Sequence, residues 1–357
     1  MTPAELAQAI PGWAAELGFD EVGITDVDLS AHEPHVRDWL AKGFQGAMGY
    51  LERNLDKRLH PELLEPDTCR VICARMNYRT AGAEPLEVIN DPTKGYVSRY
   101  ALGRDYHKTL RRRLAKLAQR INAANAAGGY RYRAFTDSAP VLEKALAEKA
   151  GLGWMGKHSL VLNQAAGSWF FLGEIYTNLP LPTNTQPQED KCGACRACMN
   201  NCPTGAIIGP KQVDARKCIS YLTIESAAAI PETLRAAMGN RIFGCDDCQL
   251  YCPWNAGAPE ATEPDFLPRA GLEQPALLEL FAWSEATFLD RTRGSAIRRI
   301  NYEQWQRNLA VALGNGPATP AALAALRARR ETASALVAEH IDWALMRLEK
   351  QSPAAAS

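Results

Sequence analysis

The sequence "CGACRACMNNCP", residues 192–203, holds four of the ten cysteines of this 357-residue chain. Their spacing is C-x2-C-x2-C-x3-C-P, a run that binds four-iron, four-sulfur clusters. In such a run the first three thiolates bind one cluster and the fourth binds a different cluster. The stretch therefore predicts a second set of cysteines, which the fold must bring next to the first.

A second run, "CDDCQLYCP" at residues 245–253, has the spacing C-x2-C-x3-C-P. It lacks the first cysteine of the full run, because Ile242 stands there and cannot bind iron. Cys218, in "DARKCISYL", is the remaining cysteine of this segment and is expected to complete the site. The predicted ligands are Cys192, Cys195, Cys198 and Cys252 for one cluster, and Cys202, Cys218, Cys245 and Cys248 for the other.

Zinc is the alternative, because tetrahedral zinc sites also use C-x2-C pairs. A zinc site needs two such pairs, however, and two proline-terminated runs fit clusters better. The two other cysteines, Cys69 and Cys73, lie in apolar, strand-like sequence and are interpreted as ordinary buried residues.

Composition sets further limits. Lys plus Arg and Asp plus Glu both total 40, so the net charge argues neither for nor against a nucleic-acid partner. The N-terminus has no basic segment followed by an apolar run, and no apolar stretch approaches the length of a membrane span. We therefore expect a cytoplasmic protein, in which clustered thiols bind metals more often than they form disulfides.

The chain divides into three expected parts. Helical and strand-like patterns alternate over residues 1–180, which predicts an α+β domain. A stretch rich in Pro and Thr, residues 179–191, leads into a ferredoxin-like two-cluster domain at residues 181–260. Residues 261–357 are expected to be helical, and residues 319–351 predict a HEAT-like helical hairpin.

Within the first part, Thr2 is the expected N-cap of the first helix and Pro140 the expected start of the third. The predicted helices cover residues 2–18, 106–124 and 140–151, and the predicted strands cover residues 21–26, 69–78, 130–137 and 167–178.

Several long motifs resemble the epoxyqueuosine reductase family. They are "FTDSAPVLEKALAEKAGLGWMGKHSLVLN" at residues 135–163, "FLGEIYTN" at residues 171–178, and the two cysteine runs, the second extended to "CDDCQLYCPWN". The resemblance covers about residues 1–350. It implies a nitroreductase-like domain that binds cobalamin, two four-iron, four-sulfur clusters, and a monomer that takes electrons from an external donor. The implied reaction reduces epoxyqueuosine to queuosine at the wobble position of tRNA, and the helical tail is expected to contact the tRNA.

The family pattern assigns the proton donor to Asp137, which lies between a predicted strand and a predicted helix. Loss of the epoxide oxygen as water requires a proton, which a carboxylic acid with a raised pKa could supply. The alternative is that Asp137 only caps the helix that follows it.

The glycine-rich loop "GLGWMGKHSLVLN" is placed by the resemblance against the corrin ring of cobalamin, with Lys157, His158 and Ser159 as its polar groups. Its glycines would let the backbone approach a flat ligand closely. The alternative for His158 is a structural histidine, and we do not expect it to bind cobalt.

Aromatic and cationic residues alternate in "GYVSRYALGRDYHK", residues 95–108. This pattern suits a nucleobase or a corrin. Tyr96, Arg99 and Tyr100 are therefore candidate contacts to cofactor or substrate, and Arg58 is another. The alternative is a surface turn that leads into a basic helix.

Cations gather in two places that could bind RNA phosphates. Residues 99–120 contain eight Lys or Arg and a single acid, Asp105. Residues 289–307 add five arginines with Tyr302 and Trp305 among them. We expect the Arg298 and Arg299 pair to contact the RNA backbone. The alternative is that both are solvated helix faces.

Two other classes of function are compatible with these motifs. One is a cobalamin- and iron–sulfur-dependent enzyme that acts on a small molecule, like the reductive dehalogenases. The other is an electron carrier with an appended binding domain, which would hold clusters without cobalamin.

Overall fold

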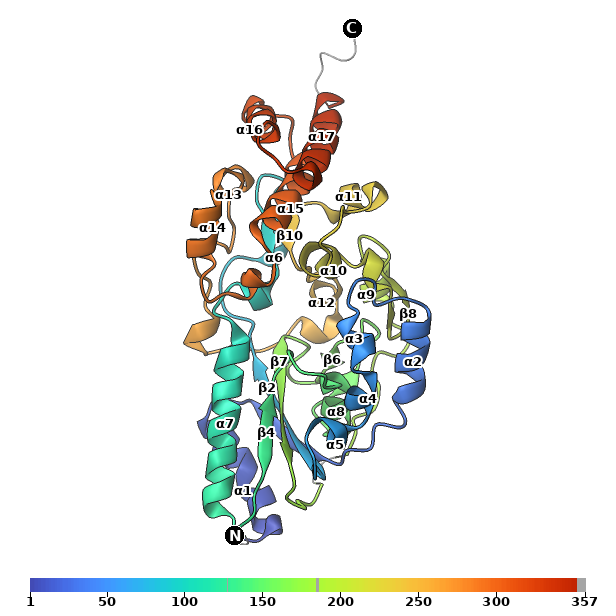
Figure 1. Ribbon diagram of the computed structural model, residues 1–357, viewed down its shortest axis with the longest axis vertical. Helices are drawn as coiled ribbons and strands as arrows, with labels where there is room; N and C mark the ends of the chain where they lie inside the picture. Colours follow the sequence, from blue (N-terminus) through green and yellow to red (C-terminus); the bar gives the residue numbers. More distant parts are fainter. Residues whose placement is uncertain (127, 184–185, 352–357) are drawn as a thin grey trace.

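An antiparallel sheet of four strands forms the centre of the N-terminal half (Figure 1). The computed structural model describes residues 1–126, 128–183 and 186–351. The strand order is β1 (Glu21–Thr25), β2 (Arg70–Asn77), β7 (Phe170–Thr177) and β4 (Tyr132–Phe135). The two central strands are buried along almost their whole length, because helices cover both faces of the sheet.

One face of the sheet packs against α1 (Pro3–Glu16) and the long α7 (Tyr106–Ala124). Thr2 caps α1 through a capping box with Glu5, and α7 has the bounds that the sequence predicts. The buried stripe of α7 consists of Leu110, Leu114, Leu117 and Ile121. This stripe fixes α7 on the sheet, so its other side faces solvent.

The opposite face carries α8 (Glu143–Lys149), which packs against Val71 and Tyr176. The predicted start of this helix at Pro140 is wrong, because Pro140 lies in a series of bends that follows β4. In these bends Asp137 has a φ of 55°, which is uncommon for a residue other than glycine. The bends therefore set Asp137 apart from both the strand and the helix.

Short elements surround the sheet. They are α2 (Glu33–Ala41), α3 (Tyr50–Arg53), α4 (Leu55–Leu59), α5 (Pro61–Leu64), α6 (Pro85–Asn90), β3 (Tyr96–Val97), the 3-10 turn η1 (Arg99–Ala101), and the hairpin of β5 (Trp154–Met155) and β6 (Val161–Leu162). Cys73 is buried in β2 as expected, whereas Cys69, which precedes the strand, is only half-buried.

The cysteine-rich segment is built from short elements. They are α9 (Ala197–Asn200), β8 (Ile207–Gly209), β9 (Gln212–Val213), η2 (Ala215–Lys217), α10 (Ile219–Ile224), α11 (Glu232–Met238), β10 (Arg241–Phe243), α12 (Asp247–Leu250) and η3 (Pro253–Asn255). β10 pairs in parallel with β3 of the first half. Ile242 in β10 is fully buried, so the position of the missing cysteine serves the apolar core instead.

The C-terminal part is helical, and its last two helices, α16 and α17, pack against each other as the predicted hairpin. Its elements are η4 (Pro264–Phe266), α13 (Leu277–Ala282), α14 (Glu285–Arg291), η5 (Ala296–Arg299), α15 (Tyr302–Gly314), α16 (Pro320–Arg330) and α17 (Ala335–Glu349). Their core is shared, because it also contains Val97 from β3 and Phe243 from β10. Within the part of the chain that the structure describes, no helix has the length and apolar character needed to span a membrane.

Candidate active site and cluster-binding cavities

The smaller of two cavities, about 210 Å³, is lined by all four cysteines expected to bind the first cluster: Cys192, Cys195, Cys198 and Cys252. Lys157 lies beside it, and its Nζ donates to the carbonyl oxygens of Gly193 (2.5 Å) and Cys195 (2.8 Å). Lys157 therefore holds the cysteine loop in place.

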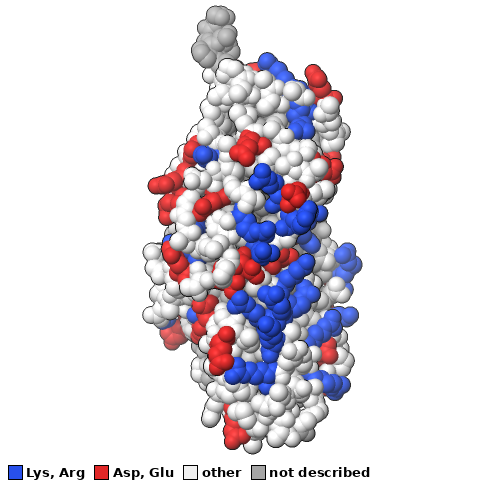
Figure 2. All heavy atoms as spheres, turned by 90° about the vertical axis from the view of Figure 1, so that its left-hand side faces the viewer, with Lys and Arg blue, Asp and Glu red and all other residues white. Residues whose placement is uncertain are grey.

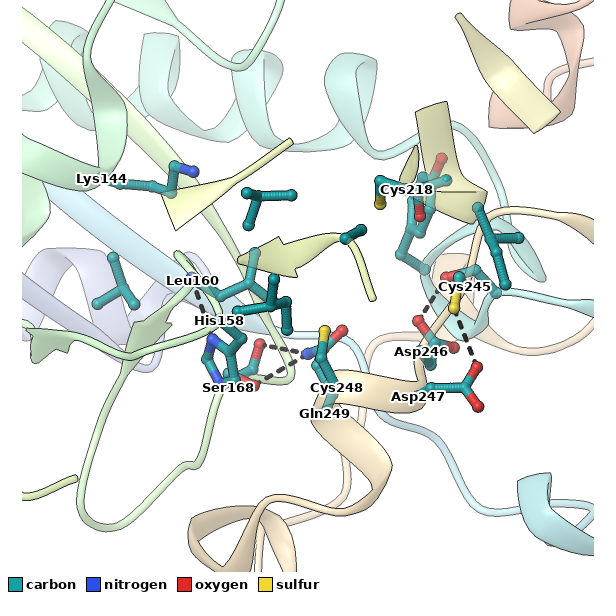
Figure 3. Close-up of a pocket in the computed structure, with 18 of the residues that line it drawn as sticks. Lys144, His158, Leu160, Ser168, Cys218, Cys245, Asp246, Asp247, Cys248 and Gln249 are labelled. Carbon is teal, nitrogen blue, oxygen red and sulfur yellow. Dashed lines mark hydrogen bonds between the residues drawn. The ribbon is translucent and has the colours of Figure 1, made fainter. Parts of the chain in front are cut away.

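The larger cavity, about 410 Å³, is lined by the cysteines expected to bind the second cluster: Cys202, Cys218, Cys245 and Cys248. Figure 3 shows Cys218 and Cys245 at one end of this cavity and Lys144 at the other. Gln249 closes the lower side, where its Nε2 donates to the carbonyl and hydroxyl oxygens of Ser168, each at 3.0 Å.

Both sets of thiols suit iron–sulfur clusters better than single ions. Four sulfurs surround each cavity, and thiolates are the ligands that such clusters prefer. Each of the two proline-terminated runs gives sulfurs to both cavities, which fits two clusters better than two zinc ions.

Asp246, between Cys245 and Cys248, ties the second cysteine set to the first half of the chain. It is buried, and it accepts hydrogen bonds from Tyr96 Oη (2.7 Å), Ser98 Oγ (2.6 Å) and the backbone N–H of residue 99 (2.8 Å). Three donors from the β3–η1 segment thus converge on one carboxylate at the edge of the larger cavity.

The structure places Tyr96 and Arg99 away from the expected cofactor contact. Tyr96 lies behind Asp246, and the guanidinium of Arg99 donates to the carbonyl oxygens of Thr80 (2.6 Å) and Ala83 (3.1 Å). The Tyr96 hydroxyl and both Nη atoms of Arg99 are hydrogen-bonded within the fold, and the residues that line the larger cavity include neither Tyr96 nor Arg99.

Two other candidates from the sequence lie close to the cavity. Tyr100 lines it and packs edge-on against Tyr106, at 6.1 Å between ring centres. Arg58 is buried, and its Nη1 donates to the carbonyl of Val141 at 3.3 Å. Arg58 therefore helps to hold the segment of residues 137–141, which carries Asp137.

Asp137 faces the larger cavity, and its side chain is 54% exposed. Its Oδ2 accepts a hydrogen bond from Tyr106 Oη at 2.5 Å and lies 3.0 Å from His107 Nε2. Both donors come from the start of α7. Asp137 does not cap α8, whose N-cap residue is Leu142.

The electrostatics of Asp137 differ from the expected raised pKa. The cavity walls partly shield the Asp137 carboxyl from water, which by itself would raise its pKa. Hydrogen bonds from His107 and Tyr106 outweigh this effect, so the pKa lies below its ordinary value. Burial lowers the pKa of the His107 imidazole, but hydrogen bonds to Asp105 and Asp137 overcome this and raise it to about 9. At neutral pH the proton therefore resides on His107.

Two further carboxyl groups lie near Asp137, the half-buried Glu143 and the buried Glu174. Glu143 lines the cavity, and its Oε1 accepts a hydrogen bond from the backbone N–H of Asp137. Burial and the charge of Asp137 raise the pKa of Glu143 to about 8. Burial and the nearby Glu143 raise the pKa of Glu174, in the middle of β7, well above its ordinary value.

His158 lies between the two cavities and lines both. Its Nδ1 accepts from the backbone N–H of Leu160 at 3.1 Å, so Nε2 carries the ring proton. Burial and Lys144 lower the pKa of His158 to about 4, which keeps the ring neutral. Nε2 is buried and has no hydrogen-bond partner among the described residues.

The glycine-rich loop is shaped by its own packing. Ser159 has a φ of 65°, and its carbonyl accepts from Lys144 Nζ at 2.8 Å. A Cβ at Gly153 would lie 2.0 Å from the carbonyl oxygen of Leu162. This glycine therefore permits the close β5–β6 hairpin, and the expected approach to a flat ligand is not what requires it.

The cations predicted to bind RNA divide into two groups. Arg298 and Arg299 are exposed; Arg299 pairs with Glu225 (Nη2–Oε2, 2.9 Å), and its guanidinium lies over the Tyr50 ring. Arg307 and Trp305 are fully buried, so they are not part of a surface patch.

Figure 2 shows Lys and Arg gathered on the face that carries α7. Five of the exposed cations on and near this helix follow one another along its N-terminal part: Arg104, Lys108, Arg111, Arg112 and Lys116. We call these five residues the α7 basic face.

Sequence reasoning did not assign roles to Tyr106, His107, Glu143 and Glu174. The signal for the first two is "DYH" at the start of α7, where Asp105 is the N-cap and its side chain accepts from the His107 backbone. No local pattern marks Glu174, because its partner Glu143 lies 31 residues earlier in the chain.

The fold and site define an iron–sulfur oxidoreductase, in which one of two four-cysteine sites opens into a cavity that also contains an acidic group. Residues 58–138 match a family model described as "Epoxyqueuosine reductase QueG, DUF1730", and residues 191–255 match the "4Fe-4S double cluster binding domain".

Individual proteins agree with these matches. The chain is 55% identical to the epoxyqueuosine reductase of Pseudomonas aeruginosa, over 97% of this chain and 95% of the relative. A solved epoxyqueuosine reductase with an epoxyqueuosine-modified tRNA-Tyr stem loop is 28% identical, with a TM-score of 0.88 over 99% of this chain and 92% of that one. A Bacillus subtilis epoxyqueuosine reductase, solved with its catalytic loop swung out of the active site, is 27% identical, with a TM-score of 0.87 over 96% and 90% of the two chains. The chain belongs to the epoxyqueuosine reductase family. The expected α+β fold, with its two-cluster segment and helical C-terminal part, is confirmed.

Proposed function

We propose that this oxidoreductase reduces epoxyqueuosine to queuosine at the wobble position of tRNA. One observation carries the proposal: the four cysteines of the second cluster and Asp137 line the same cavity. Electrons and a proton can thus reach one substrate from two sides. Family membership and the solved relative with a modified tRNA stem loop support this substrate.

Cobalamin is the proposed cofactor of the larger cavity. A corrin has an apolar ring system with carboxamide edges, and the cavity offers both kinds of partner. Leu160, Val161 and Phe170 supply apolar surface, and the unpartnered Nε2–H of His158 supplies a buried donor. When bound there, cobalamin would supply a strongly reducing metal centre.

The protein's own residues bind, orient and protonate. Reduction of an epoxide to an alkene consumes two electrons and two protons and releases water. Asp137, which faces the cavity, is the proposed proton donor to the departing oxygen. Glu143 and Arg58 hold the loop that carries it. An external one-electron donor would charge the clusters.

The α7 basic face, together with Arg298 and Arg299, is the proposed tRNA surface. Exposed cations neutralise phosphates without reading the base sequence, which suits a structured stem loop. In this proposal residues 1–180 form the catalytic part, residues 181–260 the two-cluster part and residues 261–357 a tRNA-contacting helical part of a cytoplasmic monomer.

The test is Asp137→Asn in protein reconstituted anaerobically with iron, sulfide and cobalamin. Turnover, measured by mass spectrometry of nucleosides from digested tRNA, should fall by at least ~10²-fold. Iron content, the cobalamin absorption spectrum and tRNA binding should remain those of the wild type. Normal turnover would remove Asp137 as the acid. Organohalide reduction without activity on epoxyqueuosine tRNA would instead favour a dehalogenase-like enzyme.

A further inference from the structure

We propose that His107 holds a proton at the active site and passes it to Asp137, with Asp105 as the residue that positions the imidazole. The inference deepens the proposed function and rests on it, because Asp137 is the proposed donor to the substrate oxygen. It assigns a role to a side chain that the sequence motifs leave without one.

With both carboxyl groups ionised, the hydrogen-bond geometry suits a doubly protonated ring. His107 Nδ1 lies 2.6 Å from Asp105 Oδ1, and Nε2 lies 3.0 Å from Asp137 Oδ2. A neutral imidazole has one donor and one acceptor nitrogen, so it would set a lone pair against one of these carboxylates. The imidazolium satisfies both.

The surrounding structure holds the ring in this position. His107 lies at the N-terminus of α7, where the helix dipole disfavours a cation, so the two carboxylates must outweigh that effect. The ring stacks on Tyr106 at 4.2 Å between centres, and Tyr106 stacks in turn on Phe171 at 4.0 Å. Asp105 is also the N-cap of α7, which fixes it relative to His107.

The protonation states favour proton transfer from His107 through Asp137 over an Asp137 that is already protonated before the reaction. Asp137 Oδ2 takes both the Tyr106 and the His107 hydrogen bonds, whereas Oδ1 has no hydrogen-bond partner among the described residues. Its lowered pKa leaves Asp137 ionised at neutral pH, with the proton on His107. The carboxylate alone therefore has no proton to give.

The relay balances the reaction. As the two electrons arrive from the one-electron donor, one C–O bond breaks, and the oxygen takes a proton from Asp137, which takes one from His107. The second C–O bond then breaks, the C=C bond forms, and a second proton by the same route releases water. Because the His107 side chain is 25% exposed, it can regain a proton from solvent between transfers.

The pH dependence reflects every charged group near this chain of residues. The pKa of Asp137 responds to Glu143, Arg299 and Tyr106, and the pKa of His107 responds to Asp105 and Asp137. The titratable and charged groups around this pair are Tyr50, Arg58, Tyr100, Asp105, Tyr106, Glu143, Lys144, Glu174 and Arg299.

The experiment compares His107→Gln, Asp105→Asn and the control His35→Gln, an exposed histidine on α2. Each is the full chain with clusters and cobalamin, mixed in excess with epoxyqueuosine tRNA for single-turnover rates from pH 5.5 to 10. Iron content and tRNA affinity are measured alongside. Wild type and His35→Gln should lose rate as pH rises through about 9.

His107→Gln should react ~10²-fold more slowly, and its rate should not fall at alkaline pH (the alkaline limb) as the wild-type rate does. In a further variant, His107→Ala, added imidazole should restore part of the rate. Asp105→Asn should move the limb to lower pH, while its rate at pH 6 stays within about threefold of wild type, because the ring is still charged there. If His107→Gln loses iron, Asp105→Asn alone decides the question.

The outcomes separate the two levels of the proposal. An inactive Asp137→Asn with a wild-type rate and pH profile in His107→Gln would overturn the relay and leave Asp137 as the acid. An unmoved alkaline limb in Asp105→Asn would also overturn the relay. Wild-type rates in both the Asp137 and His107 variants would refute the proposal that Asp137 donates a proton to the substrate oxygen.

Discussion

Replacement of Asp246 by Ala should selectively remove the second cluster. Its buried carboxylate accepts from Tyr96 Oη, Ser98 Oγ and the backbone N–H of residue 99, at 2.6 to 2.8 Å. Asp246 directly follows Cys245 and lies two residues before Cys248. No local helix or strand hydrogen bond can replace three donors that come from a segment about 150 residues earlier.

The magnitude follows from these three hydrogen bonds. Each buried donor left unpaired costs about 1–3 kcal/mol. The carboxylate is itself costly to bury, since burial raises the pKa of Asp246, and this offsets part of the loss. A net cost of about 3–5 kcal/mol is expected. At about 1.4 kcal/mol per tenfold, this lowers the population with the cysteine loop in its binding position roughly 100- to 4,000-fold.

The assay is iron and sulfide per chain after anaerobic reconstitution, with electron paramagnetic resonance of the reduced protein. Wild type should hold about eight irons and Asp246→Ala about four, because two four-iron clusters are expected and Cys245 and Cys248, on either side of Asp246, are ligands of the second one only. Asp246→Asn keeps one acceptor oxygen and should lie between them. The control is Asp290→Ala, an exposed residue paired with Arg293. Eight irons, lost to a chelator no faster than from wild type, would refute the reasoning.

Three further results are expected. Cys252→Ser should remove only the first cluster, leaving about four irons, because its sulfur lines only the smaller cavity; loss of both clusters would contradict the division of ligands. The double variant Arg111→Glu with Arg112→Glu should weaken tRNA binding at least ~10-fold at 0.15 M salt. The slope of log binding constant against log salt concentration should become shallower by roughly 0.7 to 0.9 for each phosphate that is no longer neutralised. Unchanged filter-binding curves would show that these arginines are only solvated. Because the fold raises the pKa of His107 to about 9, its contribution to stability is complete below pH ~6.5 and is lost as pH rises through 9. Wild type should therefore lose up to about 3 kcal/mol relative to His107→Gln between pH 6 and pH 10 in denaturant titrations, and parallel curves would contradict this.

Spacing predicted the ligand sets for seven of the eight cysteines, and Cys218 was added as the cysteine that remained in the segment. A run of the form C-x2-C-x2-C places three sulfurs around one cluster whatever surrounds it, and the proline-terminated fourth position points elsewhere. The structure accordingly gathers the same two sets around two cavities. The long α7 was equally readable, because its apolar period matches the helix repeat and a single stripe is buried.

The sequence was less informative where side chains meet partners that are distant in the chain. Alternating aromatic and cationic residues around Tyr96 and Arg99 suggested a ligand surface. In the fold, Tyr96 instead donates to Asp246, and the guanidinium of Arg99 donates to the carbonyls of residues 80 and 83. Ile242 was recognised as unable to bind iron, but only the fold shows that it fills the core shared with β3.

The sequence by itself indicated where the two cysteine runs lie, which segments are helical, and to which family the chain is similar, because these depend on spacing and order along the chain. The tertiary structure alone decided where the active-site proton lies. The pKa of Asp137 is set by Tyr106 and His107, some thirty residues earlier, and a pKa responds to distance and burial in space, which no local pattern encodes.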